Sequence, residues 1–288
     1  MKRPKIGIIG RGFVGSAVLH GFSPSVGCDA ETRVFDKDPQ RSIDTLSDTI
    51  NSSEFVFISV PTPSKVDGSI DLSILESVIS EISELSENRS TIFLIRSTVI
   101  PGTTRNLQSR FPKLKIVFNP EFLTERSANF DFLNQSRCIF GGEKENTEKV
   151  AELFRWRFGN SVSILETDFQ SAELIKYVAN TFFATKVSFL NDMKLIADKC
   201  GANWKDVVDG FVQDGRVGHS HLNVPGPDGK NGFGGVCFPK DIQAMIAFGD
   251  SIGIDLSVLK GAWKTNLKVR PERDWEALKG RAISDSED

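Results

Sequence analysis

The feature that most limits the fold of this chain is a glycine-rich turn near its N-terminus. Residues Lys5 to Ile9 read as a short strand, and Gly10, Gly12 and Gly15 follow in a G-x-G-x-x-G pattern that opens a helix. A second apolar run ends on Asp36, twenty-one residues past Gly15. Such glycines let a backbone approach a pyrophosphate at a helix N-terminus, and an acid at this distance accepts ribose hydroxyls. The pattern therefore predicts a dinucleotide-binding βαβ unit.

The acidic residue after the second strand bears on which dinucleotide is bound. A carboxylate at Asp36 repels a 2′-phosphate, so the pattern favours NAD over NADP. Lys37 and Arg41 follow within five positions and leave that preference open, because cations accommodate the phosphate.

Strand and helix patterns keep alternating through the first half of the chain. Apolar runs at 55–60, 92–95 and 115–118 read as buried strands, and residues 72–85 have the spacing of an amphipathic helix. Repeated units of this kind predict a doubly wound, Rossmann-like α/β fold with a mostly parallel sheet.

Polar clusters fall at the ends of these strands, where open α/β sheets bind their ligands. They are Pro61-Thr62-Pro63, Ser97-Thr98 and Asn119-Pro120-Glu121. Each cluster also reads as a solvated turn. Taken singly, Thr62 fits a turn, whereas Thr98 and Glu121 fit a turn and a functional site equally.

The second half of the chain has a helical pattern. Neither proline nor glycine occurs from Asp168 to Lys199, and apolar residues recur at helical spacing, which predicts one unusually long helix. Lys176 and Asn180 are four residues apart and share a face of that helix. The 288 residues suggest about two domains. We expect a Rossmann-like domain over residues 1–167, a smaller all-helical domain over 168–268 and a polar tail over 269–288.

A glycine-rich loop, Gly232 to Gly235, precedes a single cysteine, Cys237. Proline is favoured early in helices, so we expect a helix from about Pro239. The helix dipole and Lys240 would both favour a Cys237 thiolate, with Asp241 pointing back to the same place. An isolated cysteine is more simply read as a small buried hydrophobe, but its place between loop and helix favours a reactive thiol. Exposed loop amides could also cradle a pyrophosphate.

Composition and cysteine use narrow the remaining classes of function. The net charge of -3 gives no electrostatic case for nucleic acid or an anionic membrane, and no apolar run approaches a membrane span. His219 and His221 lack a third ligand nearby, so we expect no metal. The four cysteines are scattered and form no pair typical of a metal site, which indicates reduced thiols in a cytoplasmic protein. We keep this reading for Cys28, Cys138 and Cys200 and treat Cys237 separately.

Six blocks of the sequence, in order, resemble the UDP-glucose 6-dehydrogenases and their GDP-mannose relatives. The blocks are Gly10-x-Gly12-x-x-Gly15, Val60-Pro-Thr-Pro63, Ser97-Thr98-Val-Ile-Pro-Gly102-Thr103, Asn119-Pro-Glu-Phe-Leu123, Ala172-Glu-Leu-Ile-Lys-Tyr-Val-Ala-Asn180 and Gly232-Phe-Gly-Gly-Val-Cys-Phe-Pro-Lys-Asp241. Six blocks in sequence are far more specific than any one of them.

The resemblance implies two successive NAD-dependent oxidations at C6 of a nucleotide sugar, taking UDP-glucose to UDP-glucuronate. The aldehyde is trapped at Cys237 as a thiohemiacetal, which is oxidised to a thioester and hydrolysed. The resemblance gives Glu121 the role of general base for the hydrolytic water. It implies that Lys176 and Asn180 stabilise the oxyanion. Asp241 would orient a water and assist proton transfer, and Thr98 would hydrogen-bond near the reacting carbon.

The resemblance also implies which residues bind the two ligands. Those carried over for NAD are Gly10, Gly12, Phe13, Val14, Gly15, Asp36, Arg41, Pro61, Thr62, Ser97, Thr98 and Glu125. Those carried over for the sugar nucleotide are Glu121, Phe122, Leu123, Lys176, Asn180, Arg216, Gly232, Phe233, Gly234 and Gly235. Arg216 matches an arginine that reaches into the site of the partner subunit, which implies a homodimer through the long helix.

Two departures from the family and three alternatives accompany this reading. Thr124 stands where an arginine is usual before Glu125. The family carries a third domain after the central helix, and from the polar tail that begins at Arg281 we expect this domain to be missing here. The alternatives are another sugar-nucleotide dehydrogenase, such as one for GDP-mannose, a truncated non-catalytic nucleotide-binding homologue, and a β-hydroxyacid dehydrogenase. Cys237 and Glu121 argue against the last, because a single oxidation needs neither trap nor hydrolytic base.

Overall fold

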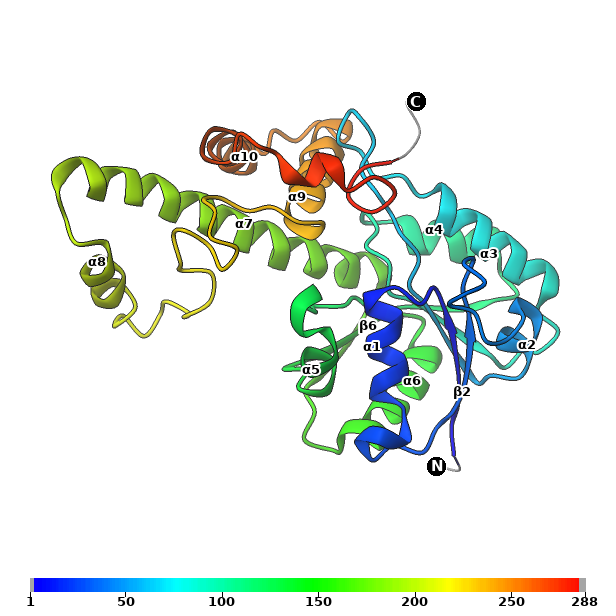
Figure 1. The fold of residues 1–288 in the computed structure, drawn as a ribbon. Helices are drawn as coiled ribbons and strands as arrows, with labels where there is room; N and C mark the ends of the chain where they lie inside the picture. The colour runs from blue at the N-terminus through cyan, green and yellow to red at the C-terminus, as the bar shows by residue number, and fades with distance from the viewer. Residues whose placement is uncertain (1–2, 285–288) are drawn as a thin grey trace. The chain divides into compact units, whose positions relative to one another are not determined.

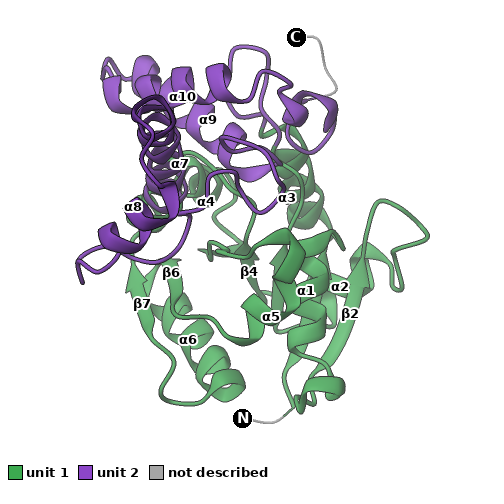
Figure 2. Ribbon diagram, turned by 60° about the vertical axis from the view of Figure 1, so that its left-hand side comes forward, with its two compact units in different colours: residues 1–62, 72–176 green, residues 63–71, 177–288 purple. Residues whose placement is uncertain are grey.

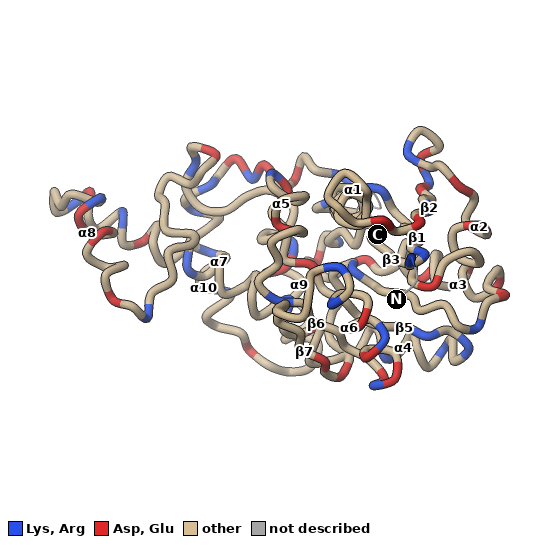
Figure 3. The backbone as a smooth tube through the Cα atoms, turned by 90° about the horizontal axis from the view of Figure 1, so that it is seen from below, with Lys and Arg blue, Asp and Glu red and all other residues tan. Residues whose placement is uncertain are grey.

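The computed structural model of the protein describes residues 3–284 and divides into two compact units. Unit 1 comprises Met1–Thr62 and Leu72–Lys176, and unit 2 comprises Pro63–Asp71 and Tyr177–Asp288 (Figure 2). Lys and Arg residues alternate with Asp and Glu residues along the backbone of the chain (Figure 3). Among residues 3–284, no helix is both long and apolar enough to cross a bilayer.

Unit 1 is built on a seven-stranded sheet in the order β2-β1-β3-β4-β5-β6-β7. Every neighbouring pair is parallel except β5 and β6, which run antiparallel. The strands are β1 Lys5–Ile9, β2 Glu31–Phe35, β3 Phe55–Ile58, β4 Ile92–Ile95, β5 Lys115–Phe118, β6 Cys138–Gly142 and β7 Ile164–Thr167. The expected doubly wound, mostly parallel α/β sheet is therefore confirmed.

Helices cover both faces of this sheet, because its central strands are apolar at every position (Figure 1). Helices α1, α5 and α6 share a core with Phe57, and helices α2, α3 and α4 share a second core with Val56 on the opposite face. Their bounds are α1 Phe13–Gly21, α2 Leu46–Asn51, α3 Ser73–Leu85, α4 Thr103–Arg110, α5 Ala128–Leu133 and α6 Lys144–Phe158, with short 3-10 turns at η1 Pro24–Val26 and η2 Glu125–Ser127. Alternate side chains of one strand thus serve separate cores.

Unit 2 is helical, as expected. The long helix α7, Phe169–Cys200, begins in unit 1 and supplies unit 2 from Tyr177 onward. Around it lie α8 Trp204–Phe211, α9 Cys237–Ser251, α10 Ser257–Val269 and the 3-10 turn η3 Asp274–Ala277. Ala184, Phe233, Ile242 and Ala262 form a buried core that joins α7, the glycine loop, α9 and α10.

Two local features of unit 2 differ from the sequence-based expectation. Helix α9 begins at Cys237 instead of Pro239. Proline is tolerated there because N–H groups in the first turn have no partner within the helix. The residues after 268 were read as a polar tail, yet Trp275 and Ala282 are each only 2% exposed.

Candidate active site

The glycine turn between β1 and α1 has the shape that a dinucleotide requires. Gly10 has φ +87°, and a Cβ at Gly15 would overlap the Gly10 carbonyl oxygen. A Cβ at Gly12 would meet nothing within 4 Å. The first and third glycines therefore close the turn, whereas the second leaves open backbone at the N-terminus of α1, where Phe13 and Val14 follow.

The carboxylate at the end of β2 is fixed beside this turn. Asp36 accepts hydrogen bonds from the backbone amides of Arg11 (2.5 Å) and Asp38 (2.9 Å). The Arg11 guanidinium donates to the carbonyl oxygen of Arg41, and the Arg41 side chain pairs with Asp38 at 3.3 Å. These contacts hold the acid where ribose hydroxyls are bound in this fold.

The loops after β3 and β4 are joined by two hydrogen bonds. The Thr62 hydroxyl donates to the Thr98 carbonyl oxygen at 2.8 Å, and the Ser97 hydroxyl donates to the Val60 carbonyl oxygen at 2.7 Å. Thr62 and Ser97 are buried, whereas Pro61 is exposed. The structure therefore brings together Thr62, Ser97 and Thr98 at the carboxyl edge of the sheet.

A buried ion pair forms at the next strand end. The Lys176 ammonium donates to the Glu121 carboxylate at 2.8 Å and to the Glu121 carbonyl oxygen at 2.7 Å. The other carboxylate oxygen accepts the Leu123 amide at 2.8 Å. The two side chains are 4% and 6% exposed, so the charges are held in a nearly dry place.

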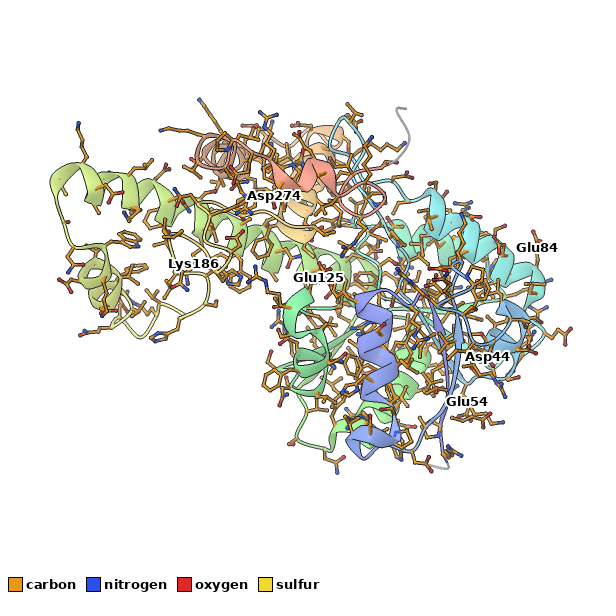
Figure 4. All side chains as sticks on the ribbon, viewed as in Figure 1. Asp44, Glu54, Glu84, Glu125, Lys186 and Asp274 are labelled. Carbon is orange, nitrogen blue, oxygen red and sulfur yellow. The ribbon has the colours of Figure 1, made fainter. Side chains whose placement is uncertain are left out.

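The aromatic residue after Glu121 lies near two cations. The Phe122 ring centroid is 4.1 Å from the Arg137 guanidinium carbon and 5.5 Å from the Lys176 nitrogen. A cavity of about 170 Å³ opens beside it, with Leu123, Phe130 and Arg137 among its lining residues. Glu125 begins the exposed turn η2 (Figure 4).

Two buried charged residues of unit 1 were missed by the sequence reasoning. Arg96 is 1% exposed and donates to the Asn119 side chain at 2.5 Å. Burial lowers the pKa of Arg96 to about 10, against the attraction of Glu121. The fully buried Glu173 accepts the amides of Gly102 and Thr104, which fixes the start of α4 just after Thr98. The available signal was a charged residue in an otherwise apolar run.

The unit 2 part of the site is a second buried charge cluster. The Asn180 amide donates to one Asp241 oxygen at 2.5 Å, and the Lys240 ammonium pairs with the other at 2.5 Å. Asp241 is only 1% exposed. From the sequence we expected the Lys240 charge to stabilise a thiolate at Cys237, whereas in the structure Lys240 forms an ion pair with Asp241.

Cys237 is the first residue of the fifteen-residue helix α9 and is partly exposed. Asp241 lies one helical turn further on. The glycine loop before Cys237 is held by amide side chains: Asn191 accepts the Gly232 amide at 3.1 Å, and Asn266 accepts the Phe233 amide at 2.7 Å. The thiol therefore follows a loop whose backbone is fixed.

Predicted residues thus gather into separate groups within each unit. Glu121 meets Lys176 in unit 1, and Asn180 meets Asp241 in unit 2. Lys176 and Asn180 are four residues apart on α7 and share one of its faces. Arg216 stays apart from both groups on an exposed segment, where it pairs with Asp214.

The fold defines a dinucleotide-binding α/β unit followed by a helical unit that carries a cysteine at a helix start. Residues 31–156 match the NAD binding domain of the UDP-glucose/GDP-mannose dehydrogenase family, and residues 170–268 match its central domain. The chain belongs to the UDP-glucose/GDP-mannose dehydrogenase family.

Individual relatives agree with this assignment. The UDP-glucose 6-dehydrogenase of Rickettsia prowazekii is 38% identical over 232 residues, covering 77% of this chain and 52% of that protein. The chain thus spans about half the length of such curated relatives. A UDP-glucose dehydrogenase structure from Pyrobaculum islandicum superposes with a TM-score of 0.80 at 26% identity, covering 96% of this chain and 70% of that one. A Mycobacterium tuberculosis 3-hydroxyisobutyrate dehydrogenase shares the fold, with a TM-score of 0.74 at 15% identity over 94% of each chain.

Proposed function

We propose that this protein oxidises the C6 hydroxyl of UDP-glucose to the carboxylate of UDP-glucuronate, with NAD as the acceptor. The observation that carries the proposal is the placement of Cys237. It is a partly exposed thiol at the start of α9, directly after a fixed glycine loop and one turn before the buried Asp241. Such a position suits a thiol that attacks a bound carbonyl carbon.

The residues of unit 1 fit NAD. The open backbone at Gly12 would lie against the pyrophosphate, and Asp36 with Arg41 would hold the adenosine ribose. When bound there, NAD would supply the hydride acceptor for each of the two oxidations. The remaining residues assigned to the cofactor are Gly10, Phe13, Val14, Gly15, Pro61, Thr62, Ser97, Thr98 and Glu125.

The chemistry on the protein side centres on the sulfur of Cys237. In the first oxidation the C6 alcohol loses a hydride and a proton and becomes an aldehyde. The thiolate then forms a carbon–sulfur bond to the aldehyde carbon, giving a thiohemiacetal. Loss of a second hydride and a proton leaves a thioester. Water breaks the carbon–sulfur bond, which releases the carboxylate and regenerates the thiol.

The buried charge pairs have complementary roles in these steps. Lys176 and Asn180 donate hydrogen bonds to the oxygen that becomes negative when sulfur or water adds. Glu121, once Lys176 has turned to that oxygen, takes a proton from the hydrolytic water. Asp241 orients a water and assists proton transfer, and Thr98 binds beside the reacting carbon. The proposal requires Cys237 to reach the nicotinamide when both ligands are bound.

The sugar nucleotide would lie along two segments. Phe122 and Leu123 follow the general base, and the loop from Gly232 to Gly235 offers backbone amides to phosphate oxygens. The loop glycines suit this use because a side chain at Gly234 would overlap Arg270.

We further propose a homodimer through α7. An exposed apolar stripe runs along this helix at steps of four and seven residues, and its members in unit 2 are Val178, Phe182, Phe189 and Ile196, each more than half exposed. Contiguous apolar surface of this kind marks protein–protein contact. In the dimer, Arg216 would reach the site of the partner subunit. Sedimentation should show a dimer that Phe189→Glu dissociates; a wild-type monomer at micromolar concentration would contradict this part.

The test of the activity counts NADH against product. Purified protein is incubated with NAD and each of UDP-glucose, GDP-mannose and a 3-hydroxy acid, and the acid formed is quantified by mass spectrometry. Two NADH per UDP-glucuronate is the expected result. One NADH per 3-hydroxy acid consumed would support a single-oxidation dehydrogenase instead. Turnover of GDP-mannose alone would change the substrate, and no NADH from any of them would make the chain a non-catalytic homologue.

The covalent step has its own test. Cys237→Ser is expected to abolish acid release, because an alkoxide does not form at neutral pH as a thiolate does. Cys200→Ser is the matched control, since Cys200 is exposed at the end of α7. Normal UDP-glucuronate production by the Cys237 variant would refute the thioester route.

A further inference from the structure

Residues Arg270–Ser284, which we name the strap, follow α10 and contact two loops of unit 2. We propose that the strap is a positioning element that sets the glycine loop before Cys237, through Arg270 and Asp274. The effect of the strap on catalysis rests on the proposed function. Its effect on the conformation of the glycine loop is argued from the contacts within unit 2 alone. Residue 268 ends the part of the chain that matches the family's central domain.

Arg270 is the centre of these contacts. Its side chain is 2% exposed and pairs with Asp228 at 2.6 Å and with Asp274 at 2.6 Å. It also donates to the carbonyl oxygen of Asn231 at 3.3 Å. Paired, hydrogen-bonded guanidinium groups in such a place fix geometry, because each donor has one direction. Residues 228 and 231, which lie shortly before the glycine loop, are therefore tied to the strap.

Asp274 extends the same network towards the thiol. Both of its carboxylate oxygens accept from Arg270, at 2.6 and 3.1 Å, and one of them also accepts the Gly235 amide at 3.4 Å. Gly235 is two residues before Cys237. Figure 4 labels Asp274. The backbone of Gly234 lies so close to Arg270 that no Cβ fits between them. The strap thus contacts the chain shortly before the glycine loop and also the last two residues of that loop, Gly234 and Gly235.

The far end of the strap is attached to the loop at 63–71. The Ser64 amide donates to the Ala282 carbonyl oxygen at 2.9 Å, and the Ser284 amide donates to the Ser64 carbonyl oxygen at 2.7 Å. The Ser284 hydroxyl donates to Asp71 at 2.9 Å. This loop directly follows Thr62 in the chain. One short segment therefore connects residues 63–71 of unit 2 with the loop before Cys237.

A purely structural strap would stabilise unit 2 without affecting the thiol. The two possibilities differ in what Asp274 does, because its contact with Gly235 lies on the loop and its contact with Arg270 lies within the strap. A positioning role predicts that weakening Asp274 alters the loop and Cys237 while the rest of α9 is unchanged. A structural role predicts a general loss of protection throughout unit 2.

The experiment compares Asp274→Asn and Arg270→Lys with the control Glu276→Gln in the full chain. Glu276 lies in the same segment, and its carboxylate pairs with Arg273. Hydrogen exchange is followed in peptides covering 226–237 and 242–251, and site-specific alkylation of Cys237 by iodoacetamide is followed by mass spectrometry. Loss of a hydrogen bond to a charged group raises the equilibrium constant for local opening roughly tenfold. We therefore expect the amides of 226–237 to exchange about tenfold faster in the two strap variants than in the wild type.

The expected pattern is specific. Both strap variants should change the Cys237 alkylation rate by about threefold or more, with 242–251 and the control unchanged. Unchanged exchange and alkylation in both variants would overturn the proposal, as would equal loss of protection in both peptides. Under the proposed function, KM for UDP-glucose should rise about tenfold with kcat less affected. If the wild-type chain showed no turnover, the proposed function would be refuted. The exchange and alkylation results would still decide whether the strap positions the glycine loop.

Discussion

The ammonium nitrogen of Lys176 lies 2.8 Å from a Glu121 carboxylate oxygen and 2.7 Å from the Glu121 carbonyl oxygen, with both side chains buried. One lysine on α7 thus fixes both the backbone and the side chain of the residue that follows β5 and Pro120. The pair is 55 positions apart in sequence, so it ties the start of α7 to the carboxyl edge of the sheet.

Removing one partner of this pair should be costly. Lys176→Met leaves a buried carboxylate without its cation, and such losses amount to about 3–5 kcal/mol. The free energy of unfolding is measured by urea denaturation. The double variant Lys176→Met with Glu121→Leu should recover part of the loss, because no buried charge remains. A single variant as stable as the wild type would show that the pair is not buried in solution.

Substitutions at two glycines of the turn after β1 should affect stability and cofactor binding differently. Gly15→Ala forces a Cβ against the Gly10 carbonyl oxygen and should lower the free energy of unfolding by about 1–3 kcal/mol. Gly12→Ala meets open space and should leave stability within about 0.5 kcal/mol. It should nevertheless weaken NAD binding at least about tenfold by calorimetry, since the methyl group would stand between backbone and pyrophosphate. Equal NAD affinity in wild type and Gly12→Ala would place the cofactor elsewhere.

The fold was predictable because its signals are local. Short apolar runs between glycine turns and helical patterns identify strands and helices one at a time, and their alternation fixes a parallel sheet. The long helix could be predicted from 168–199 in the same way, and it spans Phe169–Cys200. The start of α9 was misplaced by two residues, because Pro239 fits more than one position in a first turn.

The partners within the site were not predictable from local pattern. Lys176 and Asn180 share a helix face by spacing alone, but nothing local pairs Lys176 with Glu121. Arg96 and Arg270 would be read as surface residues from their type, yet each is almost fully buried by contacts from distant segments. Lys240 pairs with its neighbour Asp241, an outcome that depends on how the side chains pack.

The buried glutamate before Lys176 should give a measurable pH dependence. Burial raises the pKa of Glu173 above its usual value of 4.5, although hydrogen bonds from Thr104 and Gly102 oppose this. Ionisation therefore costs more in the folded state, so the contribution is present below pH 4.5 and is lost as pH rises through the folded pKa. The free energy of unfolding should fall more steeply above pH 4.5 in wild type than in Glu173→Gln, which cannot titrate.

An exposed glutamate provides the control for that measurement. The hydrogen bond and charge of Lys149 lower the pKa of Glu145, so its linkage has the opposite sign. Glu145→Gln should remove a small contribution that is lost towards acid pH. If the Glu173 and Glu145 variants gave the same slope relative to wild type, burial of Glu173 would be refuted.

Acid should weaken the strap. Burial opposes ionisation of Asp228 and Asp274, but the hydrogen bonds and charge of Arg270, together with backbone hydrogen bonds from Lys230 and Gly235, outweigh it and hold the pKa of both carboxyls below the usual 3.8. Their contribution is therefore present above pH 3.8 and is lost as pH falls through the lower folded pKa. Urea denaturation at pH 6 and pH 3 should show Asp274→Asn less stable than wild type at the higher pH, with the gap closing at the lower. A gap that widened in acid would mean that Arg270 does not hold these carboxylates.

Mixing two inactive variants should restore activity if the site is shared between subunits. Arg216→Ala lacks the arginine proposed to reach the partner subunit, and Cys237→Ser lacks the thiol. In a mixed dimer, one site combines the intact thiol of one chain with the intact arginine of the other. Random exchange makes half of the dimers mixed, each with one complete site of two, so about a quarter of wild-type NADH production is expected. Arg216 pairs with Asp214 on an exposed segment, so its loss should leave each chain folded. A mixture as inactive as its components would place Arg216 and Cys237 in the same subunit's site.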